Sequence, residues 1–216
     1  MRNIHFTTCG LTLPQNKYIL SSLVFAISVV ESYFETNLDQ VNLITAKSFE
    51  EYIKLVQINR PPAGVTYFNK GSIYTYNPYM WSVRENNHST TDLKSSLIHE
   101  LVQLYFSLAK KRPPLWIVKG YGVYLSAYSS TQVRKRERWL SKLLRNCPVP
   151  NIFSYKVSFQ SHPHPLLCYL IAYKYVEYLS CNYGKFAFID HHSRHEFGSK
   201  SWSSFVKLVS HRYRID

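Results

Sequence analysis

Strand-like and helix-like hydrophobic patterns occupy different parts of this chain. Short runs rich in β-branched and aromatic residues fall within the first 90 residues, at 41–45, 65–68 and 72–76. The last two flank a turn that contains Gly71, which predicts a β-hairpin. Helical spacing of apolar residues predicts two early helices, over 16–37 and 49–58. It also predicts a helical second half, with helices over 92–110, 115–128, 131–145, 166–181 and 202–213. Ser48 and Thr91 are the expected N-caps of the helices over 49–58 and 92–110. We therefore expect an α+β fold with a small mixed sheet.

The chain has a length that suits one large domain. We expect a single domain over residues 1–216, in which residues 1–91 contain the sheet and residues 92–216 contain the long helices. The apolar stretch Tyr18–Val30 is shorter than the ~20 residues that a membrane-spanning helix needs. It is expected to be a buried helix, so no transmembrane segment is predicted. The cysteines form no C-x-x-C pair, which favours free thiols and a cytoplasmic location.

Positive charge is concentrated in the second half of the chain. The net charge is +13, and residues 101–216 hold 18 of the 26 Lys and Arg but only 5 of the 13 Asp and Glu. Basic runs within residues 110–145 could contact nucleic acid or an anionic surface. A solvated basic helix face is the alternative interpretation of the same pattern.

The residues His99-Glu100-x-x-Gln103 lie in the first long helix of that half. Residues four apart share one helix face, so His99 and Gln103 are neighbours there. In the pattern H-E-x-x-H, two histidines bind Zn²⁺ and the glutamate acts as general base. Here the second histidine is replaced by Gln103. A second segment, Pro114-Leu-Trp-Ile-Val-Lys-Gly-Tyr-Gly-Val-Tyr-Leu-Ser126, follows at a short distance.

Together these segments resemble the gluzincin clan of metallopeptidases, and in particular small peptidase MA-like domains. That family continues with P-x-W-[LI]-x-E-G-x-A-x-[YF]-[LF]-S, whose glutamate is the third zinc ligand. By this resemblance, His99 matches the first ligand and Glu100 the general base. Gln103 and Lys119 stand where the other two ligands belong. The resemblance implies a zincin-like fold and a downstream helix with a transition-state tyrosine, matched by Tyr169 or Tyr173.

Two of the three implied ligands are therefore poor donors for zinc. An amide oxygen binds zinc weakly, and an ammonium must lose its proton before it coordinates. We expect no cofactor, and an inactive pseudopeptidase that binds a protein or peptide partner. Two alternatives remain open: an active zinc metallopeptidase with non-standard ligands, which would require zinc, and a basic nucleic-acid-binding protein.

Two structural expectations follow from the resemblance. A buried Glu100 without a metal needs a counter-charge, so we predict an ion pair between Glu100 and Lys119. Strand 72–76 is expected at the sheet edge, where relatives add their substrate as a β-strand. Tyr74 and Tyr76 on that strand, together with Trp116, are the expected contacts of the partner.

Two histidine-rich segments offer further possible metal ligands. His191 and His195 are four residues apart, and His162 and His164 flank a proline. We interpret both segments as polar loops, since two histidines without a placed third ligand are weak evidence of a metal site.

Overall fold

The computed structural model describes residues 3–8, 10–56, 66–69, 71–81, 90–109, 113–128, 133–155, 159–185 and 196–213. The chain divides into two compact units, Met1–Lys111 (unit 1) and Arg112–Asp216 (unit 2). The division falls after the helix that carries His99 and Glu100, one helix later than the boundary at residue 91 that the sequence suggests.

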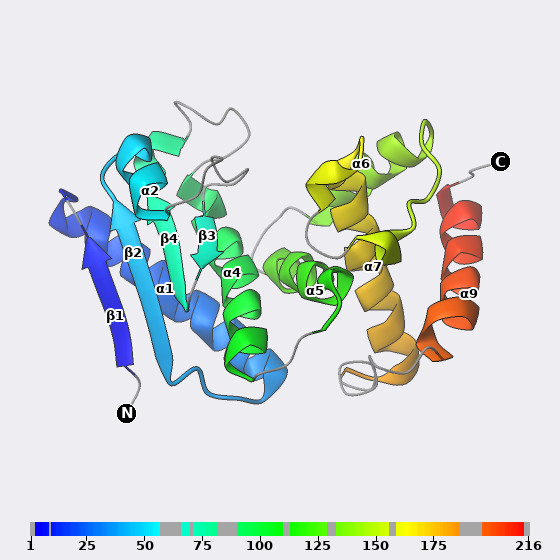
Figure 1. The fold of residues 1–216 in the computed structure, drawn as a ribbon, viewed down its shortest axis with the longest axis horizontal. Helices are drawn as coiled ribbons and strands as arrows, with labels where there is room; N and C mark the ends of the chain where they lie inside the picture. The colour runs from blue at the N-terminus through cyan, green and yellow to red at the C-terminus, as the bar shows by residue number, and fades with distance from the viewer. Residues whose placement is uncertain are drawn as a thin grey trace. The chain divides into compact units, whose positions relative to one another are not determined.

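Unit 1 is built on a four-stranded mixed sheet (Figure 1). The strands are β1 (Asn3–Thr8), β2 (Gln40–Ala46), β3 (Thr66–Asn69) and β4 (Ser72–Tyr76), in the order β1-β2-β4-β3. β1, β2 and β4 are parallel, whereas β3 runs antiparallel to β4 in the predicted hairpin, with Asn69 opposite Ser72. The expected α+β class with a small mixed sheet in the N-terminal half is confirmed.

The expected edge position of residues 72–76 is wrong. β4 pairs with β2 on one side and with β3 on the other, so β3 forms that edge of the sheet. The error has a physical reason: the hairpin is a local signal, but the parallel pairing of β4 with β2 depends on the crossover through the intervening helix. The sequence analysis also missed β1, which forms the opposite edge.

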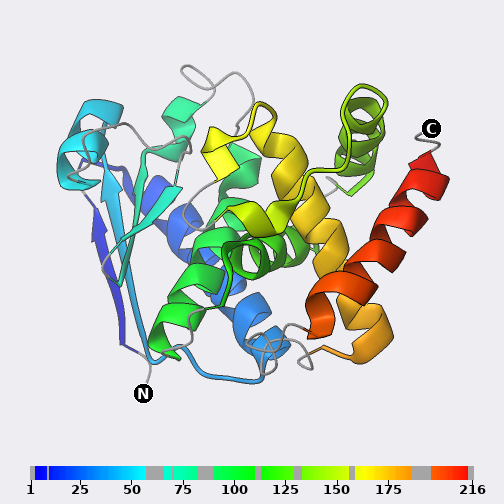
Figure 2. The ribbon, with the colours of Figure 1, turned by 45° about the vertical axis from the view of Figure 1, so that its right-hand side comes forward.

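Three helices cover the sheet of unit 1. They are α1 (Leu13–Phe34), α2 (Phe49–Val56) and α4 (Leu93–Leu108). Figures 1 and 2 show α1 and α4 on one face and α2 on the other. By length and composition alone α1 could cross a membrane, which is weak evidence of a membrane span, and 44% of its apolar window is buried within the structure.

The starts of two unit 1 helices show how far local capping could be predicted. Ser48 accepts a hydrogen bond from the Glu51 backbone N–H at 3.2 Å, as expected for the N-cap of α2. The side chain of Glu51 in turn accepts from the Lys47 N–H at 2.8 Å. Thr91 does not cap α4; it lies in a short 3₁₀ turn, and Asp92 takes the cap position.

Unit 2 is helical in its described part. It contains α5 (Leu115–Tyr128), α6 (Val133–Leu144), α7 (Pro165–Tyr183) and α9 (Glu196–Tyr213). α7 is central and packs against each of the other three. Aromatic rings from α5, α7, α9 and the segment before α7 form its core, with Tyr175 in contact with Trp116, Phe153, Trp202 and Phe205.

The contact between α5 and α7 depends on a glycine. A Cβ atom added to Gly120 would lie 2.6 Å from Val176 Cγ2 and 2.7 Å from the carbonyl oxygen of Ala172. No ordinary side-chain contact is that short, so only glycine allows the two helices to approach this closely.

Candidate functional site

The carboxylate of Glu100 lies at the centre of the candidate site in unit 1. It is 7% exposed and lies on the face of α4 that packs against β3. Thr66 Oγ1, on β3, donates a hydrogen bond to Glu100 Oε1 at 3.3 Å. Gln103 Nε2, one turn along α4, donates to Glu100 Oε2. Both carboxylate oxygens therefore accept a hydrogen bond from a neutral side chain.

An aromatic cluster lies close to this carboxylate. Tyr52 on α2 is fully buried, and its ring centroid is 5.5 Å from that of Tyr76 on β4. Burial, and then the nearby negative charge of Glu100, raise the pKa of Tyr52 well above its usual value. The phenol of Tyr52 therefore stays protonated at neutral pH.

The residues at this site do not fit a catalytic zinc ion. Such a site needs three good protein ligands. His99 supplies an imidazole, but the amide of Gln103 acts as a donor to Glu100. Across the described segments, no group of three His, Cys, Asp or Glu side chains is placed to hold a metal ion.

Lys119, the third position of the motif, belongs to unit 2. It lies on α5 and is half-buried. Because Glu100 and Lys119 belong to different units, their ion pair stays a prediction.

The structure corrects the expected contacts of a partner. Tyr76 is 1% exposed and packs against Phe49 and Tyr52 inside unit 1. Trp116 is 7% exposed and belongs to the aromatic core of unit 2. Neither ring is accessible to a partner at the surface. Tyr74 remains half-exposed, but on an internal strand.

The two candidate tyrosines of the downstream helix lie on α7. The ring of Tyr169 packs against that of Phe159, with the two ring centroids 5.1 Å apart. Tyr173 is 3% exposed, and its hydroxyl donates to Glu177 Oε1 at 3.4 Å. Burial raises the pKa of Tyr173. Both residues lie in unit 2 and Glu100 in unit 1, so their assistance at the site stays a prediction.

The histidine-rich segments provide little further chemistry. The backbone N–H of His164 donates to His162 Nδ1 at 2.9 Å, which makes a local turn before α7. His191 and His195 lie outside the described residues, as do Lys110–Arg112 of the first basic run.

A buried charge network in unit 2 was missed by the sequence analysis. Lys174, on α7, is 8% exposed and forms ion pairs with Glu137 on α6 and, at 2.7 Å, with Glu177. The hydroxyl of Tyr213, on α9, also donates to Glu137. The available signal was a single lysine within the apolar run 166–176, which implies a buried cation that needs partners.

The ionisation of this network is set by competing effects. Burial opposes charge on Glu137, but hydrogen bonds from Lys174 and Tyr213 outweigh it and lower the pKa of Glu137. Burial likewise opposes charge on Lys174, but its bonds to Glu137 and Glu177 raise its pKa. Both groups are therefore charged at neutral pH.

Comparison with known proteins adds no family assignment. No protein-family model matches the sequence, and a search of curated proteins returns no match.

Proposed function

We propose that the chain is a domain of the gluzincin, peptidase MA-like class. Within that class we propose a pseudopeptidase that does not use zinc and that acts by binding a peptide or protein partner. The hydrogen bond from Gln103 to Glu100 carries this proposal. In this bond Gln103, which replaces a metal ligand of the family, binds Glu100, the residue that matches the general base.

The hydrogen bonds to Glu100 support the proposal that the domain does not hydrolyse peptides. Glu100 can act as a base in such a site only if a bound metal lowers the pKa of the attacking water. Thr66 and Gln103 instead each donate a hydrogen bond from a neutral group to one of its oxygens. A carboxylate held in this way has a structural role, because it ties α4 to β3.

Restoring the two missing ligands should restore zinc binding. We expect the wild-type protein to retain less than about 0.1 zinc per chain after dialysis. The double variant Gln103→His/Lys119→Glu should retain about one, because it supplies three ligands of the implied types. Metal content measured by mass spectrometry on the purified proteins tests this.

Controls separate a restored site from adventitious binding. Each single variant should stay near the wild-type level, and adding His99→Ala to the double variant should remove most of the metal. A folded double variant that binds no zinc would contradict the gluzincin resemblance. Stoichiometric zinc in the wild-type protein, lost on His99→Ala, would contradict the pseudopeptidase assignment.

The open edge of the sheet is the proposed place for a peptide. β3 pairs with β4 on one side, and none of the described strands pairs with its other side. An extended peptide added there would bind through backbone hydrogen bonds at every second residue. Thr66, the residue that bonds to Glu100, lies on the same strand, so the peptide would lie beside the candidate site.

Backbone methylation tests this binding mode. Heptapeptides selected by display on the purified protein should lose at least about tenfold in affinity when alternate amides in one register are N-methylated. N-methylation of the remaining amides, which would point away from β3, should leave the affinity nearly unchanged. Calorimetry or fluorescence anisotropy would measure both.

The edge itself can be identified by crosslinking. A photoreactive residue at the centre of a selected peptide should label residues 66–69 of β3. The matched control is the opposite edge, residues 3–8 of β1. Labelling of β1 alone, or equal tolerance of both methylation registers, would contradict binding to β3.

A further inference from the structure

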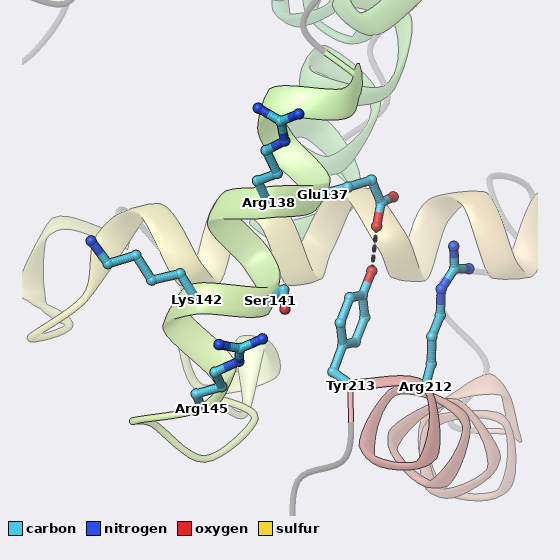
Figure 3. Close-up of a pocket in the computed structure, with 7 residues that line it drawn as sticks. All are labelled: Glu137, Arg138, Ser141, Lys142, Arg145, Arg212 and Tyr213. Carbon is cyan, nitrogen blue, oxygen red and sulfur yellow. Dashed lines mark hydrogen bonds between the residues drawn. The ribbon is translucent and has the colours of Figure 1, made fainter.

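An open hollow in unit 2 is lined mainly by positive charge. Its volume is about 740 Å³, within the range of small-molecule sites. The described residues that line it come from α6, its C-terminal end and α9: Glu137, Arg138, Ser141, Lys142, Arg145, Arg212 and Tyr213 (Figure 3). Four cations against one carboxylate give this lining a net charge of +3 at pH 7.

The cations of α6 are arranged along one face. Arg138, Lys142 and Arg145 follow the spacing i, i+4, i+7, so they cover about 10 Å of the helix on the same side. All three side chains are exposed, as is Arg212 across from them on α9. Like charges at this spacing repel one another and destabilise a helix slightly. A bound anion would relieve that repulsion.

The carboxylate in the lining also has partners outside the hollow. Glu137 is held by the buried Lys174 and by the hydroxyl of Tyr213, a bond that Figure 3 draws between α6 and α9. The same bond fixes α9 against α6, and Arg212 is the neighbour of Tyr213 in the chain. The two sides of the hollow are thus linked before any ligand arrives, which lowers the entropy cost of binding.

We propose that this hollow binds a small molecule that carries two or more phosphate groups. Guanidinium groups match phosphate oxygens in a bidentate geometry, and three of the four cations are arginines. The charge of the lining matches an anion of about three negative charges. Cations from two helices surround one hollow, an arrangement that suits a compact anion better than an extended nucleic-acid strand. This site belongs to unit 2 and does not rest on the proposed function.

Binding of inorganic tripolyphosphate is the direct test. Calorimetry in low-salt buffer should detect one site per chain, with sulfate binding at least about tenfold more weakly because it carries a single anionic centre. The variant Arg138→Gln/Arg212→Gln should lose at least about tenfold in affinity. The matched control Lys54→Gln/Lys207→Gln removes the same charge from exposed positions outside the hollow and should bind like the wild-type protein.

A second variant keeps the test decisive if the first one fails to fold. The variant Lys142→Gln/Arg145→Gln keeps the hydrogen bond between Glu137 and Tyr213 that links α6 to α9. It should weaken the binding of tripolyphosphate by a similar factor. No binding at millimolar tripolyphosphate, or an equal loss in the control variant, would overturn the proposal. So would binding of an oligonucleotide that tripolyphosphate does not displace, because that result would indicate an extended polyanion surface. Comparing the affinities of adenosine polyphosphates and inositol polyphosphates with that of tripolyphosphate would show whether the phosphate groups belong to a nucleotide or to a lipid headgroup.

Discussion

Replacing Lys174 with methionine is expected to destabilise unit 2 by about 2–3 kcal/mol at pH 7. The substitution leaves Glu137 and Glu177 next to each other without their shared cation, and removing one partner of a buried pair typically costs about 3–5 kcal/mol. We expect less than that here because the Glu137 side chain remains 27% exposed. Urea unfolding monitored by tryptophan fluorescence would measure the loss, since Trp116, Trp139 and Trp202 all lie in unit 2.

The effect should depend on pH in one direction. The pKa of Glu137 is lowered in the folded protein, so its contribution is present above the ordinary carboxyl pKa of about 4.3 and is lost as pH falls through the folded value. The pKa of Lys174 is raised, so its contribution is complete below about pH 10. The difference between wild type and variant should stay constant from about pH 6 to 9 and shrink below about pH 4.

A compensated variant provides the control. Lys174→Met/Glu137→Gln removes one carboxylate together with the ammonium and should recover part of the lost stability. Equal stability of Lys174→Met and the wild-type protein at pH 7 would show that the pair contributes nothing in solution. A pH-independent difference that persists into acid would assign the loss to packing of the lysine stem instead.

Replacing Gly120 with leucine should prevent α5 from docking on α7. The first added carbon already meets Val176 Cγ2 at 2.6 Å and the backbone of Ala172 at 2.7 Å. Backbone cannot rotate away as a side chain can, so the helices must separate. Overpacking of this kind costs about 1–3 kcal/mol and more for large side chains, so we expect at least about 3 kcal/mol for leucine.

Alanine at the same position is a sharper test because two effects oppose each other. Alanine favours a helix over glycine by about 1 kcal/mol. We still expect Gly120→Ala to destabilise, by about 1–2 kcal/mol, because the steric conflict exceeds the helical gain. Val118→Leu, an enlargement at a half-exposed position of α5, should change stability by less than about 0.5 kcal/mol. Stabilisation by Gly120→Ala in urea titrations would show that α5 and α7 are not so closely packed.

The elements that were predicted correctly are those whose sequence patterns are only a few residues long. Helix 115–128 was predicted with the observed boundaries, and the N-cap of α2 and the β3–β4 hairpin were recognised from their local sequence. β1 was missed because Ile4 and Phe6 are its only large apolar residues and both stay half-exposed. An edge strand with so few apolar residues has little hydrophobic pattern to detect.

The candidate site was predictable only in its residue types. The motif implied a buried Glu100, and Glu100 is 7% exposed, but the counter-charge expected from Lys119 stays a prediction. The Glu100 partner Thr66 was not identified, because a contact across 34 residues depends on tertiary packing. The same applies to the bond between Glu137 and Tyr213, which joins residues 76 positions apart. Tyr76 was assigned to binding because its strand was expected at the edge of the sheet. Aromatic residues are common both in interfaces and in cores, so the residue type alone does not separate the two roles for Tyr76 or Trp116.

The late position of α9 has a consequence for how the protein matures on the ribosome. Trp202 and Phe205 complete the aromatic core around Tyr175, and Ser201 shares a hydrogen bond of 2.9 Å with the hydroxyl of that tyrosine. Until this segment leaves the exit tunnel, a nascent chain must expose the rings of α5 and α7. The sheet lies in unit 1, a separate compact unit that precedes α9 in the chain and can fold first. Chaperones that capture apolar segments during synthesis should therefore engage α5 and α7 and release them when α9 emerges.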